Sequence, residues 1–201
     1  HGRDQLAELA TSFNDMTSNV QRLLEVEKAQ QRIQSDLEIA REVQDQLYPQ
    51  VIPEAEELMI TAARSPARLV SGDYYDFQKL ANGDVAIVIG DVAGKGISAA
   101  LLMATLQSSF RMELREGLEL VATATGNDAV RSTSVSPSQV VSNLNKHLFE
   151  FTSAEKYATF FCGVYEHSSS TLTYTNAGHL PPILVHQGSV HRLEVNGMVV
   201  G

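Results

Sequence analysis

Two aspartates, Asp73 and Asp91, lie beside glycines at the ends of two short apolar stretches that have the composition of β-strands. The turn Asn82-Gly83 between these stretches is the strongest short signal for a β-hairpin. Asp73 lies nine positions before Asn82 and Asp91 eight after Gly83, so the hairpin brings both carboxylates to one end. Two adjacent carboxylates raise each other's pKa unless cations intervene. Their pairing therefore predicts a site for Mg²⁺ or Mn²⁺, which prefer oxygen ligands.

The segment Gly94-Lys95-Gly96 follows Asp91 and precedes a predicted helix. Backbone N–H groups at a helix N-terminus favour an anion such as phosphate, and Lys95 adds a positive charge. The alternative is that the glycines only shape the turn and that Lys95 is a solvated loop residue. A Walker nucleotide loop is excluded, because it needs four residues between its first glycine and Gly-Lys, then Ser or Thr. Only three residues separate Gly90 from Gly94, and a glycine follows the lysine.

The composition excludes several classes of function. The chain has 15 Lys and Arg residues against 24 Asp and Glu, so its net charge is −9. An acidic chain is unsuited to sequence-independent nucleic-acid binding, which needs a basic surface. The apolar runs are too short to cross a membrane. Cys162 is the only cysteine, so no intrachain disulfide forms and a reducing, cytoplasmic compartment is expected; its apolar neighbours favour core packing over catalysis.

The part of the chain after residue 58 combines short β-type runs with two helical stretches. Helices are expected over residues 97–115 and from residue 136 to about 151, and residues 117–136 between them lack apolar periodicity and predict a loop. Strands followed by helices and then by strands predict an α+β fold, an antiparallel sheet with both helices on one face. The expected strands are residues 59–63, 74–80, 85–90, 157–166, 171–175, 183–186 and 190–193.

The first 48 residues predict one long helix, since nothing between Gly2 and Pro49 breaks it. Its apolar residues recur at coiled-coil spacing and then change phase, a stammer-like break. A helix without a core of its own must pair, so we expect a homodimer through residues 4–47. Residues 49–57 form a linker, and residues 58–201 the globular domain. The first seam is Leu6, Leu9, Phe13, Met16, Val20 and Leu23; the second is Val26, Ile33, Leu37, Ala40 and Leu47, with Gln30 and Gln44 between.

The start of this helix resembles the second helix of a HAMP module. The resemblance rests on Asp-Gln-Leu-Ala-Glu-Leu-Ala at residues 4–10 and Phe-Asn-Asp-Met at residues 13–16. HAMP modules link membrane sensors to cytoplasmic output domains, so the resemblance implies a relay whose register or rotation switches the next domain. The alternative is a simple dimerisation stalk. Any membrane attachment is expected only through an upstream part of a longer parent protein.

Five ordered motifs resemble the bacterial SpoIIE-type branch of the PPM, or type-2C-like, serine/threonine phosphatases. The motifs are residues 38–44 with 47–49, residues 71–76, residues 90–96 with 99–104, residues 157–160, and residues 176–182. The resemblance runs from about Glu38 to the last residue. It implies a PPM-type antiparallel β-sandwich flanked by α-helices, here preceded by the long coiled-coil helix.

The resemblance also implies a reaction and its residues. Two Mn²⁺ or Mg²⁺ ions activate a water that attacks phosphoserine or phosphothreonine in line. By motif match, Asp91 would bridge both ions, the Val92 carbonyl would bind one, and Asp73 would hold the second. Asp76 would be an outer partner of the metal site or else a strand cap, and residues 94–96 would meet the phosphate. The usual substrates in the family are phosphorylated small proteins that antagonise anti-sigma factors.

Two features of the last segment depart from this pattern. Asn176 and His179 have catalytic side chains, but the following Pro181-Pro182 favours a hydrogen-bonded turn. The family adds two further metal-binding aspartates, one in a Thr-Asp-Gly sequence, whereas this chain has no Asp after Asp128. The 201 residues therefore resemble a fragment with half of the metal site, expected to be inactive or weakly active alone. A non-catalytic pseudophosphatase dimer is the main alternative, and a two-metal nucleotidyl cyclase is disfavoured by the motif order.

Overall fold

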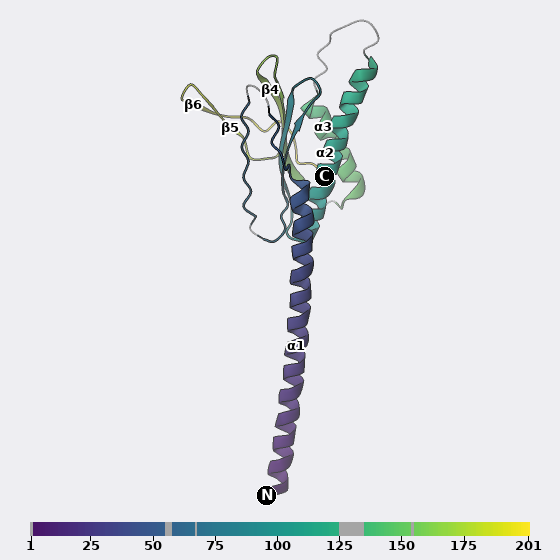
Figure 1. Ribbon diagram of the computed structural model, residues 1–201, viewed down its shortest axis with the longest axis vertical. Coiled ribbons are helices and arrows are strands. Elements are labelled where there is room, and N and C mark those ends of the chain that lie inside the picture. Colours follow the sequence, from purple (N-terminus) through teal and green to yellow (C-terminus); the bar gives the residue numbers. More distant parts are fainter. Residues whose placement is uncertain (1, 55–57, 67, 125–134, 154) are drawn as a thin grey trace. The chain divides into compact units, whose positions relative to one another are not determined.

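The computed structural model describes residues 2–54, 58–66, 68–124, 135–153 and 155–201. The chain divides into two compact units, His1–Glu42 and Val43–Gly201. The first unit is helical, and the second contains an antiparallel sheet with helices on one face (Figure 1). The α+β class and the long N-terminal helix expected from the sequence are therefore confirmed.

Helix α1 spans Gly2–Leu47, and its last turn, from Val43 onward, belongs to the second unit. No proline and no glycine interrupts it after Gly2, which leaves its backbone hydrogen bonds intact. The apolar side chains of the first seam are exposed where they are described; Phe13, for example, is 60% exposed and Leu23 62%. Within a single copy of the chain, the helix therefore leaves its apolar stripe in solvent. No described helix is long and apolar enough to span a membrane.

Four antiparallel strands form the main sheet in the order β1-β2-β3-β4. They are β1 (Asp73–Lys79), β2 (Val85–Val92), β3 (Ala158–Glu166) and β4 (Thr171–Ala177). The expected hairpin joins β1 to β2: Gly83 has a φ of +90°, a conformation that favours glycine, and its N–H donates to the Leu80 carbonyl at 3.0 Å. This turn fixes the register of the two strands.

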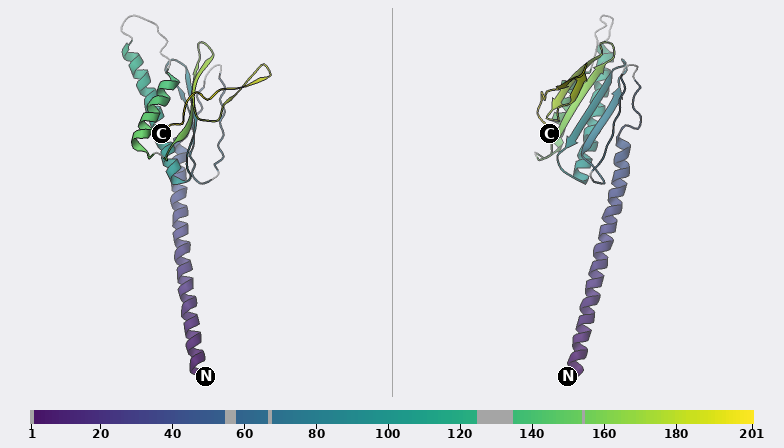
Figure 2. Two further views of the ribbon diagram at one scale, coloured as in Figure 1. Left: turned by 180° about the vertical axis from the view of Figure 1, so that it is seen from behind. Right: turned by 90° about the vertical axis from the view of Figure 1, so that its left-hand side faces the viewer.

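Helices α2 (Ile97–Ala124) and α3 (Pro137–Phe151) cover one face of this sheet (Figure 1 and Figure 2). Helix α3 begins after Ser136 with Pro137 in its first turn, where the missing N–H costs no helical hydrogen bond. The core lies between helices and sheet. Its largest fully buried side chains are Tyr74, Phe110, Phe160, Met103, Leu106, Leu144 and Leu148.

Strands β5 (Ile183–His186) and β6 (Ser189–Arg192) form a separate two-stranded sheet around the turn Gln187-Gly188 (Figure 2). All eight strand residues are exposed, and none of the other described helices or strands lies against them. Ile183 and Val185 face one side of this ribbon and Leu184 the other, because strand residues alternate. The family resemblance implies two packed sheets; the described residues form one four-stranded sheet and a two-stranded ribbon that does not pack against it.

Two of the secondary-structure predictions are wrong. Helix α2 continues to Ala124 instead of ending near residue 115, because residues 118–124 are mostly helix-compatible Leu, Glu, Ala and Val. The expected loop therefore loses its first residues, and residues 125–134 lie outside the described part. Residues 59–63 form no strand, and Met59 is 94% exposed. Alternating polarity identifies a residue's preferred face but does not supply a strand to pair with.

Candidate metal centre

The two aspartates lie directly opposite each other on neighbouring strands. Asp73 is the first residue of β1, Asp91 is next to the last of β2, and their Cα atoms are register partners. Both side chains are exposed, whereas the alternate residues Tyr74 and Val92 are buried in the core. Strand alternation therefore directs both carboxylates to the sheet face away from the helices. The hairpin predicted that both carboxylates lie at one end of the two strands, and the structure adds that they are direct partners on one face.

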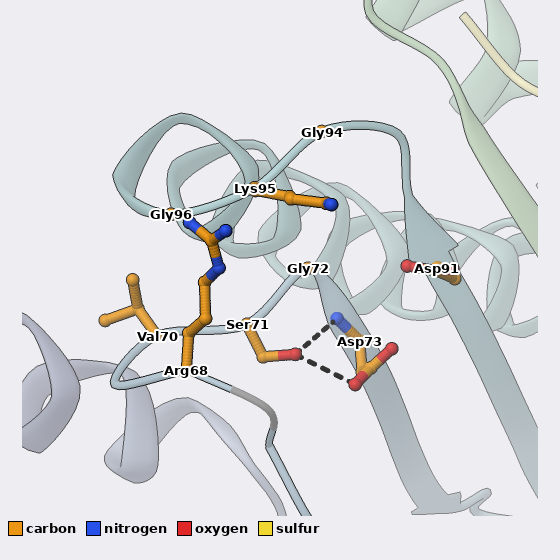
Figure 3. Close-up of a pocket in the computed structure, with 9 residues that line it drawn as sticks. All are labelled: Arg68, Val70, Ser71, Gly72, Asp73, Asp91, Gly94, Lys95 and Gly96. Carbon is orange, nitrogen blue, oxygen red and sulfur yellow. Dashed lines mark hydrogen bonds between the residues drawn. The ribbon is translucent and has the colours of Figure 1, made fainter.

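Both carboxylates line a cavity of ≈ 390 Å³ (Figure 3). The same cavity is lined by the segment before β1, with Arg68, and by the loop after β2, with Lys95, so two cationic side chains extend into it beside the two carboxylates. The remaining lining residues are Val70, Ser71, Gly72, Gly94 and Gly96. A second cavity of ≈ 290 Å³ also shares Asp73 and Asp91, and it includes Arg64 and His179. The carboxylate pair thus borders two cavities.

The charges of this site perturb one another. Partial burial raises the pKa of the Asp91 carboxyl, and the neighbouring Asp73 carboxylate raises it further, whereas His179 lowers it. Burial lowers the pKa of the His179 ring against the opposing pull of Asp91 and Asp73. The Nδ1 atom of His179 lies 2.8 Å from Thr159 Oγ1, within hydrogen-bond distance. A site that raises the pKa of one carboxyl by placing another beside it favours a cation between them.

The donor chemistry fits part of a divalent-metal centre. Carboxylate and carbonyl oxygens are the ligands that Mg²⁺ and Mn²⁺ take. The Val92 carbonyl faces the segment before β1, because a Cβ atom on Gly72 would lie 2.9 Å from its oxygen. Among the described residues, however, no group of three or more Asp, Glu, His or Cys side chains could hold a metal. Asp73, Asp91 and Val92 therefore fit as a partial ligand set.

The loop after Asp91 has the glycine-dependent shape expected of it. Gly94 and Gly96 have φ values of +119° and +70°, which other residues rarely adopt. Helix α2 begins at Ile97, so the loop delivers the helix N-terminus to the cavity edge. Lys95 between the glycines is exposed. Positive charge and free helix-terminal N–H groups together favour an anion beside the carboxylates.

Asp76 does not join the carboxylate pair, which corrects the prediction of an outer metal partner. It is fully buried on the helix side of the sheet, three residues after Asp73 and hence on the opposite face. Arg111 of α2 donates to it through Nε at 2.7 Å and Nη2 at 3.3 Å. The Tyr74 hydroxyl, the Phe77 N–H and the Gln78 amide also donate to it. Asp76 thus links β1 to α2 through its ion pair with Arg111.

Asn176 and Cys162 have structural surroundings. Asn176 is buried, and its Oδ1 accepts a hydrogen bond from the His179 N–H at 2.8 Å, as in the expected turn before Pro181-Pro182. The Asn176 N–H in turn donates to Asn196 Oδ1 at 2.7 Å. Cys162 is buried in the core, and burial raises the pKa of its thiol to about 12. A thiol with that pKa is not a nucleophile at neutral pH.

Sequence reasoning did not assign a site role to Arg68, Gln44 or Tyr48. Arg68 reaches the cavity from a segment without periodicity, so no local pattern marks it. Gln44 donates a hydrogen bond to the Ser71 carbonyl, and Tyr48 donates one to the carbonyl of Asp73 itself. One signal was present for Gln44, because a glutamine at an apolar seam position of a helix needs a polar partner.

Comparison with known proteins identifies the family of this chain. The family model "Stage II sporulation protein E (SpoIIE)" matches residues 81–201, which include Asp91. "Phosphoserine phosphatase RsbU" of Bacillus subtilis is 35% identical over 174 residues, covering 86% of this chain and 47% of that protein. "Protein IcfG" of Synechocystis sp. is 32% identical over 216 residues, covering 99% of this chain and 33% of that protein. The chain thus spans half or less of the length of these relatives.

A solved structure supports the fold alone. The SiaA-PP2C domain of Pseudomonas aeruginosa superimposes with a TM-score of 0.63 at 15% identity, covering 86% of this chain and 64% of that one. The family model covers more than half of the chain, and the hairpin, glycine loop and α+β architecture are those expected of that family. The chain belongs to the SpoIIE family.

Proposed function

We propose that this chain carries the phosphatase part of a metal-dependent protein serine/threonine phosphatase. The main support is that Asp73 and Asp91 are register partners and line one cavity together with Lys95 and Arg68. Two anionic oxygen donors beside two cationic side chains suit a divalent cation and a phosphoryl group together. The relatives named phosphoserine phosphatase support a phosphoserine substrate.

Asp73 and Asp91 would hold the cation, Mn²⁺ or Mg²⁺, and the Val92 carbonyl would be a further ligand. When bound, such a cation supplies a Lewis acid that lowers the pKa of water and polarises phosphoryl oxygens. The family resemblance implies two such ions, for which Asp73, Asp91 and Val92 would supply part of the ligands. Asp73 is oriented by Ser71, whose Oγ donates to Asp73 Oδ2 at 2.9 Å. The Asp73 carboxylate therefore has a hydrogen-bond partner before any cation binds.

Lys95, Arg68 and the N–H groups at the start of α2 bind the phosphoryl oxygens. Their place in the same cavity as the carboxylates supports this role. Binding by charge and backbone donors selects a phosphate without selecting the side chain that carries it. The family resemblance, and not the phosphate-binding groups, favours a phosphoprotein substrate, such as a small anti-sigma-factor antagonist.

Helix α1 pairs with α1 of a second copy and relays a signal to this domain. Its three-and-four spacing of apolar residues and their exposure in a single copy support the pairing. The phase change after Leu23 supports a relay, since two registers of similar energy can compete there.

The test measures phosphate release from a phosphoserine protein by the full-length enzyme in Mn²⁺. Asp73→Asn and Asp91→Asn should each remove most activity, and EDTA should abolish it, because each removes charge or metal from the centre. Asp36→Asn, an exposed helix carboxylate, is the matched control. Activity that survives EDTA or Asp91→Asn would overturn the proposal. No release at any Mn²⁺ concentration by a folded full-length protein would instead favour the non-catalytic dimer module.

A further inference from the structure

The end of helix α1 is hydrogen-bonded to the segment that carries Asp73. The Gln44 side chain is 3% exposed and forms a two-point contact with the backbone of Ser71. Its Nε2 donates to the Ser71 carbonyl at 2.8 Å, and the Ser71 N–H donates to its Oε1 at 3.0 Å. An amide that matches a backbone donor and acceptor at once fixes both the position and the orientation of that peptide.

Tyr48 makes a second contact one residue beyond the helix. Its hydroxyl donates to the Asp73 carbonyl at 2.5 Å. The ring is held from two sides, by the Arg64 guanidinium 4.0 Å from its centroid and by Tyr75, whose ring centroid is 5.3 Å away. Arg64 in turn forms an ion pair with Asp45 of α1. Because the ring is buried and packed, its hydroxyl is a fixed donor for the backbone of Asp73.

The helix end is itself tethered to the core. The Gln107 side chain of α2 donates to the Leu47 carbonyl at 2.8 Å, one of the carbonyls that a helix end leaves without a partner in the helix. Asp73 needs such support, because it begins a strand and the first residues of a ladder open more readily than its centre. Its segment also passes so close to β2 that only glycine fits at position 72.

We infer that Gln44 and Tyr48 are positioning residues, which hold Ser71 and Asp73 so that the Asp73 carboxylate lies opposite Asp91. The effect on metal binding rests on the proposed metal function, but the hydrogen bonds from Gln44 and Tyr48 form without metal. Groups that orient a metal ligand typically change metal affinity 10–100-fold when they are removed. Neither Gln44 nor Tyr48 lines the cavity of the carboxylate pair, so they act through the backbone of Ser71 and Asp73.

The first experiment needs no metal. Amide hydrogen exchange is measured on the metal-free chain, Gln44→Met and Tyr48→Phe, with Gln46→Ala, an exposed glutamine of the same turn, as control. Gln44→Met keeps the length of the side chain but removes the partner of the Ser71 N–H, so exchange at Ser71 should accelerate about tenfold or more. Tyr48→Phe removes only a hydroxyl and keeps the packed ring, so it tests the hold without endangering the fold. Unchanged exchange over residues 70–74 in both variants would overturn the inference.

The second experiment measures Mn²⁺ binding by calorimetry on the same proteins. The dissociation constant should rise about tenfold in Gln44→Met and severalfold in Tyr48→Phe, and should stay within about twofold in Gln46→Ala. Faster exchange with unchanged Mn²⁺ affinity in both variants would overturn the positioning role. A wild-type chain that binds no Mn²⁺, with exchange responding as expected, would count against the proposed metal function and leave the hold itself supported.

Discussion

The buried pair Asp76–Arg111 offers a sharp test of the division between structural and metal-binding carboxylates. Asp76 is fully buried and accepts hydrogen bonds from Arg111, Tyr74, Phe77 and Gln78. Asp76→Asn keeps the volume but replaces one charged oxygen by a donor that faces other donors. Breaking a buried pair by changing one partner typically costs about 3–5 kcal/mol. Since the Arg111 side chain is 37% exposed and water can reach its freed charge, we expect the lower end, about 3 kcal/mol.

The assay is urea unfolding followed by circular dichroism, with Mn²⁺ calorimetry on the same samples. Asp76→Asn should lower the free energy of unfolding and leave Mn²⁺ affinity unchanged, because its carboxylate lies on the far side of the sheet. Asp73→Asn should weaken Mn²⁺ binding and leave the free energy of unfolding nearly unchanged. Arg111→Met, which removes the other partner of the buried pair, should also lower the free energy of unfolding. Arg115→Met, at an exposed arginine of the same helix, is its control. Undiminished stability together with weaker Mn²⁺ binding in Asp76→Asn would refute the assignment and restore Asp76 as an outer metal partner.

Three further outcomes are expected. Gly72→Ala should lower the free energy of unfolding in urea by about 1–3 kcal/mol, because its Cβ would meet the Val92 oxygen at 2.9 Å. Gly83→Ala has nothing within 4 Å of its Cβ and should cost only the backbone strain of its positive φ, about 1 kcal/mol. Equal stabilities of the two variants would argue against the close approach at Gly72. Phe13→Glu in the exposed seam should convert a dimer into a monomer in sedimentation at tens of micromolar, and a wild-type monomer there would remove the basis for pairing. Cys162 should resist iodoacetamide in the native protein at about pH 8 and react after unfolding in urea, since burial raises the pKa of its thiol to about 12; rapid native labelling would contradict its burial.

The meeting of the two carboxylates at one end of the hairpin could be predicted, because Asn82-Gly83 marks the turn. The register could not, because a two-residue turn would place Asp91 opposite Tyr74, whereas the Leu80 N–H donates to the Asp84 carbonyl across residues 81–83 and Asp73 pairs with Asp91. The seam of α1 could also be predicted, since its spacing depends only on helix geometry. The turn before Pro181 is likewise encoded within a few residues, by Asn176 and His179.

Contacts across large sequence separations could not be predicted in this way. Gln44 lies 27 positions from Ser71, and Arg111 lies 35 positions from Asp76. Strand alternation alone would have placed Asp76 on the face opposite Asp73, so the outer-partner prediction overlooked a signal that was available. The end of α2 was also missed, because weak apolar periodicity does not end a helix whose residues are all compatible with helical structure.

The β5–β6 ribbon has a consequence for how this polypeptide behaves at high concentration. Ile183, Leu184 and Val185 are consecutive, exposed and apolar on both faces, and Val190 opposite Val185 is 66% exposed. A ribbon of this kind presents two open backbone edges together with uncovered apolar faces, the combination that promotes edge-to-edge association and precipitation. Association measured by turbidity or light scattering should therefore depend on this ribbon more than on the folded core. A lysine at Val190 should raise the solubility limit, because a charge on an exposed strand opposes stacking of one ribbon on another.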